Sequence, residues 1–76
     1  MTTVDIEYCV PCGFLNRAED IQHALLSQFG DELDSVALVT GDHGVLRVDV
    51  DGEPVWDKAE DDYDVDAITR RVRAEL

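Results

Sequence analysis

Two cysteines are the most reactive side chains of the sequence, and only two residues separate them. Cys9 and Cys12 flank Val10 and Pro11, and the chain has no other cysteine. This spacing brings two sulfur atoms close enough to bridge within a tight turn, so oxidation requires little backbone movement. Because the thiolate is the attacking species in disulfide exchange, groups that stabilise it would activate the pair. The motif therefore indicates reversible thiol–disulfide chemistry.

The residues around the cysteine pair predict a strand before it and a helix after it. Residues 3–8 alternate between polar and apolar types, which is typical of a strand with one buried face. After the motif, apolar residues recur at the spacing of one helix face. These residues are Phe14, Ala18, Ile21, Leu25 and Phe29. A strand, a Cys-x-x-Cys motif and a helix in this order favour a redox pair whose thiolate the helix dipole stabilises.

The start of this helix decides how strongly its dipole acts on the thiols. Asn16 and Glu19 resemble a capping box, which would begin the regular helix at Arg17 and leave the cysteines on a loop. The apolar face begins already at Phe14, and a helix that began near Pro11 would act on the cysteines directly. Because the dipole effect decreases within one turn, the first alternative predicts a weaker stabilisation of the thiolate.

The rest of the chain predicts more strands and a second helix. Three runs typical of strands cover residues 36–40, 45–50 and 53–57. An acidic loop is expected at 57–64, followed by a helical pattern that Asp64 can cap. The order β-α-β-β-β-α, with one apolar face on the strands, predicts an α/β two-layer sandwich with both helices on one face of the sheet. The pattern leaves open whether the second and third strands, joined by residues 41–44, form a hairpin or lie on opposite sides of the first strand.

Charge is the strongest signal in the composition. The chain has 18 Asp and Glu against 6 Lys and Arg, which gives a formal net charge of −12. Such a surface argues against nucleic acid as a ligand, since phosphate binding needs cations. Self-repulsion destabilises a compact state, and molar salt, which shortens the Debye length to about 3 Å, removes most of it. The composition therefore favours a halophilic protein, the alternative being an acidic mesophilic one.

The sequence gives no indication of a membrane span or of export. No run approaches the roughly 18 apolar residues of a membrane span. Residues 1–5 also lack the basic and apolar parts of a signal peptide. No repeat or linker divides the chain, so residues 1–76 should form a single domain. We therefore expect a cytoplasmic protein that is monomeric and has no membrane partner.

The cysteine pair also permits other roles. A structural disulfide would close too small a loop to restrict the unfolded chain much. A zinc site would need His23 and His43 beside the two thiolates, but their spacing matches no common zinc finger, so no metal and no cofactor are predicted. A non-catalytic, redox-switched binding module and a metal- or sulfur-handling accessory protein are further alternatives. Residues expected to contact a partner are Val10, Pro11, Gly13, Phe14 and His43.

The segment Tyr8-Cys9-x-x-Cys12-Gly13-Phe14 follows the first predicted strand. It resembles the active-site signature of the selenoprotein W, T and H (Rdx-type) family of thioredoxin-like proteins. The similarity continues through the helix end at 25–29, the strand at 44–48 and the segment 52–58, so that it covers residues 4–58. An ordered set of motifs is much stronger evidence than an isolated Cys-x-x-Cys.

The resemblance implies a minimal thioredoxin-like fold with a four-stranded mixed sheet. Its first strand would be central, the second would lie parallel beside it, and the third and fourth would form a hairpin on the other side. Residues 41–44 would then cross over the end of the first strand. The segment 42–44 lacks the proline that lines the active site of true thioredoxins, so the substrate contacts of thioredoxin are not implied.

The resemblance also implies a small thiol-disulfide redox protein whose catalytic residues are Cys9 and Cys12. Its partners would be protein or low-molecular-weight thiols. Family members with selenium carry it at the position of Cys12, which favours Cys12 as the attacking sulfur. The general behaviour of thioredoxins instead favours Cys9, on the expectation that the first cysteine is the more exposed one. Both assignments stay open at this point.

Overall fold

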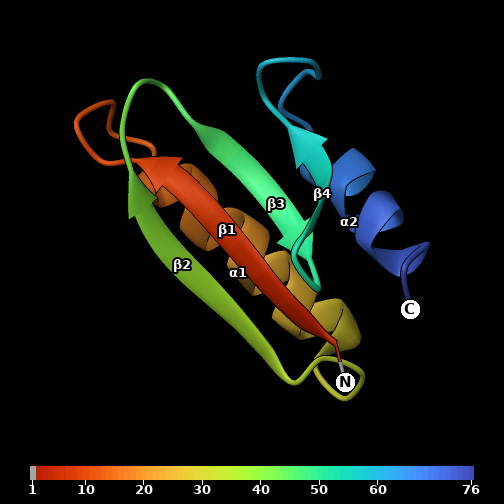
Figure 1. The fold of residues 1–76 in the computed structure, drawn as a ribbon. Helices are drawn as coiled ribbons and strands as arrows, with labels where there is room; N and C mark the ends of the chain where they lie inside the picture. The colour runs from red at the N-terminus through yellow and green to blue at the C-terminus, as the bar shows by residue number, and fades with distance from the viewer. Residues whose placement is uncertain (1) are drawn as a thin grey trace.

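Four strands and two helices follow one another in the order β-α-β-β-β-α in the computed structural model, which describes residues 2–76 (Figure 1). Each predicted element is present. The strands are β1 (Thr3–Cys9), β2 (Ser35–Gly41), β3 (Leu46–Val50) and β4 (Glu53–Asp57), and the helices are α1 (Leu15–Phe29) and α2 (Val65–Arg73). None of the helices formed by residues 2–76 is both long and apolar enough to cross a membrane.

The strands form one mixed sheet in the order β2-β1-β3-β4. Strand β1 pairs in parallel with β2 and antiparallel with β3, and β3 pairs antiparallel with β4. The connection from β2 to β3 therefore crosses over the end of β1, as the family resemblance implied, and does not form a hairpin. Two backbone hydrogen bonds secure this crossing, because Cys9 N–H donates to Val45 O at 2.7 Å and Val10 N–H donates to Gly41 O at 3.0 Å.

Both helices cover the same face of the sheet, which confirms the predicted two-layer sandwich (Figure 1). The strands contribute alternate residues to the core between the layers, as the period of two predicts. The fully buried members are Val4, Ile6, Leu46 and Val48 from the sheet, Ala18, Ile21 and Leu25 from α1, and Ile68 and Val72 from α2. Charged residues of opposite parity, Asp5 and Glu7 on β1 and Arg47 and Asp49 on β3, lie on the face without helices.

The beginnings of the two helices differ in how they are stabilised. The predicted capping box of Asn16 and Glu19 is wrong, because α1 begins at Leu15 and its N-cap residue, Phe14, makes no side-chain cap hydrogen bond. Phe14 packs against the hydrophobic core, so tertiary packing places the start of α1. Helix α2 has the predicted cap, since Asp64 Oδ1 accepts hydrogen bonds from the backbone of the next turn.

Candidate functional site

Cys9 and Cys12 are joined by a disulfide at the end of β1. Their Cα atoms are 5.3 Å apart, which lies within the usual range for a disulfide. The chain between them turns tightly, because Gly13 N–H donates to Val10 O at 3.1 Å and Phe14 N–H donates to Cys9 O at 3.4 Å. The pair expected from sequence therefore forms without disturbing the strand before it or the helix after it. We call residues 9–14 the redox loop.

Gly13 has the backbone conformation that the redox loop needs in order to turn into α1. Its φ is 76°, in the left-handed region that residues with a side chain adopt only at a cost. A Cβ atom there would meet no other atom within 4 Å, so the requirement comes from backbone conformation and not from space. The glycine that follows the second cysteine thus has a conformational role in the loop.

The two bonded cysteines differ in access to solvent. Cys9 has no exposed surface, whereas Cys12 is exposed. The expectation that the first cysteine is the more exposed one is therefore wrong. Cys9 is the last residue of the central strand β1, whereas Cys12 lies on the loop beyond the sheet. The neighbours of Cys9 across the sheet are Gly41 of β2 and the β3-side residue Val45.

Gly41 allows the end of β2 to approach the redox loop closely. A Cβ atom at this position would lie 2.7 Å from Glu7 Oε2 and 2.9 Å from Val45 Cγ1. Both distances are shorter than a Cβ atom tolerates, so any larger residue must displace its neighbours. In the sequence Gly41 resembles an ordinary turn glycine, and only the crossing connection explains why no side chain fits there.

The residues expected to contact a partner lie at one end of the sheet. Val10 is 51% exposed, and Pro11 and Gly13 are also exposed, whereas Phe14 is half-buried. His43 is exposed on the connection between β2 and β3, where its Nδ1 contacts the carboxylate of Asp42. The two backbone hydrogen bonds of the crossing connect this segment to the redox loop, and the two loops lie together in Figure 1.

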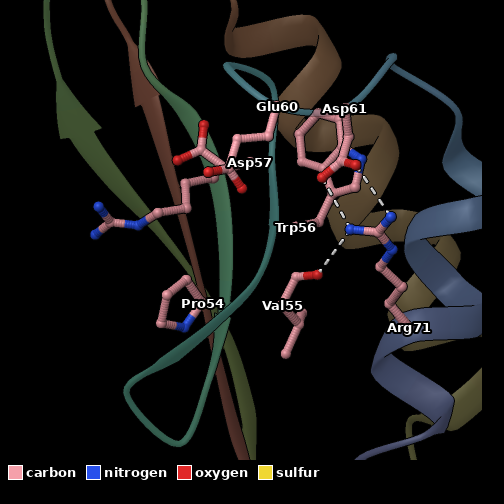
Figure 2. Close-up of a pocket in the computed structure, with 8 residues that line it drawn as sticks. Pro54, Val55, Trp56, Asp57, Glu60, Asp61 and Arg71 are labelled. Carbon is pink, nitrogen blue, oxygen red and sulfur yellow. Dashed lines mark hydrogen bonds and ion pairs between the residues drawn. The ribbon is translucent and has the colours of Figure 1, made fainter.

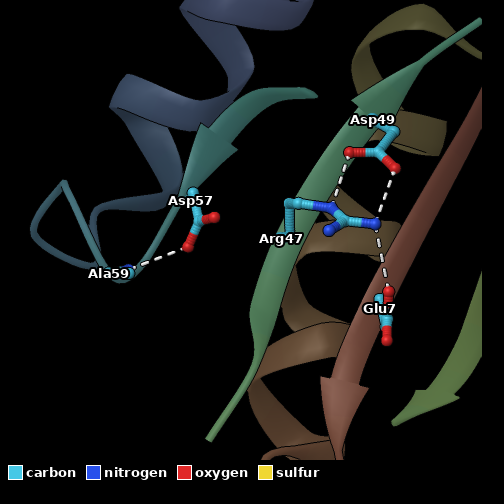
Figure 3. Close-up of polar contacts among 5 residues, drawn as sticks. All are labelled: Glu7, Arg47, Asp49, Asp57 and Ala59. Carbon is cyan, nitrogen blue, oxygen red and sulfur yellow. Dashed lines mark hydrogen bonds and ion pairs between the residues drawn. The ribbon is translucent and has the colours of Figure 1, made fainter. Parts of the chain in front are cut away.

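An ion-pair cluster on the open face reduces the negative charge near the cysteines. Arg47 Nη2 donates to Glu7 Oε1 at 3.1 Å, and Arg47 Nε donates to Asp49 Oδ1 at 3.0 Å (Figure 3). The hydrogen bond that Arg47 donates to Asp49, together with the negative charge of Asp49, raises the pKa of Arg47 above the ordinary value. Because Glu7 precedes Cys9 by two residues on β1, the pairing with Arg47 partly neutralises the carboxylate nearest to the disulfide in sequence.

Phe14 is in contact with two cations. The guanidinium of Arg17 lies 5.1 Å from the centre of its ring, and Lys58 Nζ lies 5.5 Å from it. Arg17 also lies 5.2 Å from the ring of Tyr63, which packs edge-on against Trp56. No local sequence signal could have identified this cluster, because its members come from α1, from the end of β4 and from the loop before α2.

A hollow of about 260 Å³ lies between β4 and α2 (Figure 2). No residue of the redox loop lines it. Arg71 extends along it, donating to Val55 O at 3.2 Å and to Asp61 Oδ2 at 2.8 Å. The hydrogen bond from Arg71 holds the pKa of Asp61 below its ordinary value. Arg71 and Asp61 thus form an ion pair within the lining of the hollow.

The zinc arrangement considered from sequence is not formed. Among residues 2–76, no group of three or more His, Cys, Asp or Glu side chains is placed to hold a metal ion. The cysteines are bonded to each other, His23 is exposed on α1, and His43 is exposed on the connection between β2 and β3.

Comparisons with known proteins agree with this fold. A model of the Rdx family matches residues 3–74, which include the redox loop, all four strands and both helices. The chain is similar to a protein from Bordetella parapertussis whose crystal structure is known, with 38% sequence identity and a TM-score of 0.92. The match covers 99% of this chain and 98% of that chain. It also shares the fold of a selenoprotein W-related protein from Vibrio cholerae, with 24% sequence identity and a TM-score of 0.87. That match covers 96% of this chain and 94% of the other. No curated protein matches the sequence.

Proposed function

Because the chain belongs to the Rdx family and joins Cys9 to Cys12 in one disulfide, we propose that it is a small thiol–disulfide oxidoreductase that cycles this pair between dithiol and disulfide. The observation that supports this function most directly is the exposure of Cys12 beside a buried, bonded partner. An exposed sulfur can reach a substrate, and the buried one can react only within the molecule.

The proposed cycle begins with the dithiol form. The thiolate of Cys12 attacks a substrate disulfide, forms a mixed disulfide and releases the first substrate thiol. Cys9 then attacks Cys12 Sγ, restores the internal disulfide and releases the second substrate thiol. Two electrons pass from the protein to the substrate, and the protons of the two cysteine thiols leave on the two released thiols. In the opposite direction the same steps oxidise a substrate dithiol.

Two features of the chain support thiolate formation at Cys12. The first turn of α1 contains no acidic residue, and the side chain of Phe14 caps none of its N–H groups, so the positive end of the helix dipole remains available. The helix begins three residues after Cys12, between the two starting points considered from sequence. The pairing of Glu7 with Arg47 also weakens the repulsion that this carboxylate would exert on a thiolate.

Single cysteine variants test the proposed cycle. In Cys9→Ser, Cys12 can still attack a substrate but nothing resolves the product, so a mixed disulfide should accumulate. Cys12→Ser retains only the buried sulfur and should accumulate little. Intact-mass measurement after exposure of each reduced variant to 2-hydroxyethyl disulfide gives the result. Equal trapping by both variants, or trapping by Cys12→Ser alone, would contradict the assignment, and trapping by neither would refute the oxidoreductase function.

A redox-switched binding module is the second candidate, and the exposure of Val10 favours it. An apolar side chain that is 51% exposed near the exposed Cys12 is a surface that a protein partner could cover. This role requires the shape of the redox loop but no sulfur exchange. A partner that binds the oxidised chain and releases the reduced one, without formation of a mixed disulfide in either single variant, would favour the binding module over catalysis.

A further inference from the structure

Two positive charges lie beside the redox loop of a strongly acidic chain. The formal net charge is −12, and the chain has only 6 Lys and Arg. Arg17 and Lys58 approach the ring of Phe14, at 5.1 Å and 5.5 Å from its centre. Both side chains are exposed. Their positions on one aromatic ring bring together cations from α1 and from the end of β4.

These two cations are not neutralised by carboxylates. Arg47 is paired with Glu7 and Asp49, and Arg71 is paired with Asp61. Within residues 2–76, no carboxylate lies within ion-pair distance of Arg17 or Lys58.

Acidic residues close in sequence form no ion pair with either cation within residues 2–76. Asp57 Oδ1 accepts from Ala59 N–H at 2.9 Å, and its carboxylate lies on the side of Arg47 (Figure 3). Asp20 lies near the Tyr63 hydroxyl, whose pKa its charge raises. The charges of Arg17 and Lys58 are therefore available to an external anion.

The ring that both cations approach belongs to the redox loop, and so does the exposed cysteine. Cys12 and Phe14 are two residues apart, so their Cα atoms are separated by at most about 7.6 Å. The Debye length at physiological ionic strength is about 8 Å. A small disulfide that reacts at Cys12 therefore binds in the same loop as the ring on which the two cations lie.

We propose that Arg17 and Lys58 bind the carboxylate of a low-molecular-weight disulfide, so that the preferred small substrates of Cys12 are anionic. This inference rests on the proposed oxidoreductase function. A small substrate meets mainly these two local charges, whereas an acidic protein would face the whole negative surface of the chain. The carboxylate takes no part in bond exchange. Its binding orients the substrate disulfide toward Cys12, which attacks one sulfur while the other leaves as a thiolate and takes up a proton.

The test uses three small disulfides that differ only in their end groups. They are 3,3′-dithiodipropionate, which is anionic, 2-hydroxyethyl disulfide, which is neutral, and cystamine, which is cationic. The rate constant for oxidation of the reduced protein is measured with each one at moderate ionic strength. The quantity compared between variants is the ratio of the anionic to the neutral rate constant, because this ratio cancels differences in folding and in the reactivity of Cys12.

The double variant Arg17→Gln/Lys58→Gln should lower this ratio about tenfold, since a unit charge at about 6 Å in water changes binding about threefold. The ratio of cationic to neutral rate constants should rise. Arg70→Gln/Arg73→Gln is the matched control, because it removes the same charge from the last turn of α2 and should leave both ratios nearly unchanged.

Equal ratios in the wild-type protein and Arg17→Gln/Lys58→Gln, or equal decreases in both double variants, would overturn the inference while the function stands. Absence of reaction with all three disulfides would refute the proposed function itself, and the inference with it.

Discussion

Cys9 is completely buried, while Cys12, to which it is bonded, is exposed. In the reduced wild-type protein we expect iodoacetamide to modify Cys12 at least about ten times faster than Cys9, because access and thiolate formation control alkylation. Mass-spectrometric mapping after short reaction times measures the two rates. Denatured protein is the control, in which the two rates should approach each other. Faster modification of Cys9 in the folded protein would contradict the division of roles between the cysteines.

Replacement of Gly41 by alanine tests the close packing behind the redox loop. The new Cβ atom would meet Val45 Cγ1 at 2.9 Å and Glu7 Oε2 at 2.7 Å. The side chain of Glu7 can move toward solvent, but a shift of Val45 also moves the connection between β2 and β3. We therefore expect a loss of about 1–3 kcal/mol in the free energy of unfolding. Guanidinium chloride denaturation measures this loss. Thr40→Ala, at an exposed neighbouring position, is the control, and equal stability of both variants would argue against the steric account.

The pKa of Tyr63 reports the position of Arg17. Burial and the charge of Asp20 raise the pKa of Tyr63 above its usual range, and the charge of Arg17 opposes them. Asp20→Asn should therefore lower this pKa, and Arg17→Gln should raise it further. Spectrophotometric titration of the phenolate measures the change, with Tyr63→Phe to separate its signal from that of Tyr8. Shifts in the opposite directions would mean that these charges do not face the phenol.

The same raised pKa predicts the direction of a pH effect on stability. Because Tyr63 ionises at higher pH in the folded than in the unfolded state, the folded state retains more protons above the ordinary tyrosine pKa of about 10. The contribution of the neutral phenol is complete below that pH and is lost as the pH rises through the folded-state value. Tyr63→Phe should remove this part of the alkaline decrease in the free energy of unfolding.

The cap of α2 gives a prediction of stability that does not involve the cysteines. Asp64 Oδ1 accepts from the backbone N–H groups of Asp66 at 3.0 Å and of Ala67 at 3.3 Å. Asp64→Ala should reduce the free energy of unfolding by about 1 kcal/mol, as the loss of an N-cap usually does. Asp62→Ala removes the same charge from the exposed loop and should change stability by less than about 0.5 kcal/mol. If the two variants were equally stable, the cap would contribute nothing beyond its charge.

Salt dependence tests the proposal that the acidic surface is adapted to a saline environment. Against a formal net charge of −12, the described residues form few ion pairs, and most of the Asp and Glu residues are exposed. We expect the denaturation midpoint in urea to rise substantially between dilute buffer and molar KCl, because salt screens the repulsion. Equal midpoints in both solutions would remove the basis for the halophilic interpretation.

The sequence by itself determined the elements and the reactive pair. Alternation in residues 3–8 and helical spacing from Phe14 to Phe29 depend only on which neighbours are apolar, and the observed strand β1 and helix α1 follow them. The Asp64 cap is equally local, since it joins residues within one turn. The spacing of Cys9 and Cys12 was sufficient to predict a bridge for the same reason.

Only the tertiary structure decided which cysteine is accessible and which charges surround it. Cys9 lies where the end of β1 meets Gly41 of β2 and Val45 before β3, and the approach of Lys58 and Arg17 to Phe14 joins the end of β4 to α1. The same dependence explains why the start of α1 was predicted incorrectly, because packing of Phe14 replaced a side-chain cap. Local periodicity records the preferences of adjacent residues, whereas exposure and electrostatic surroundings depend on segments that meet only after the chain has folded.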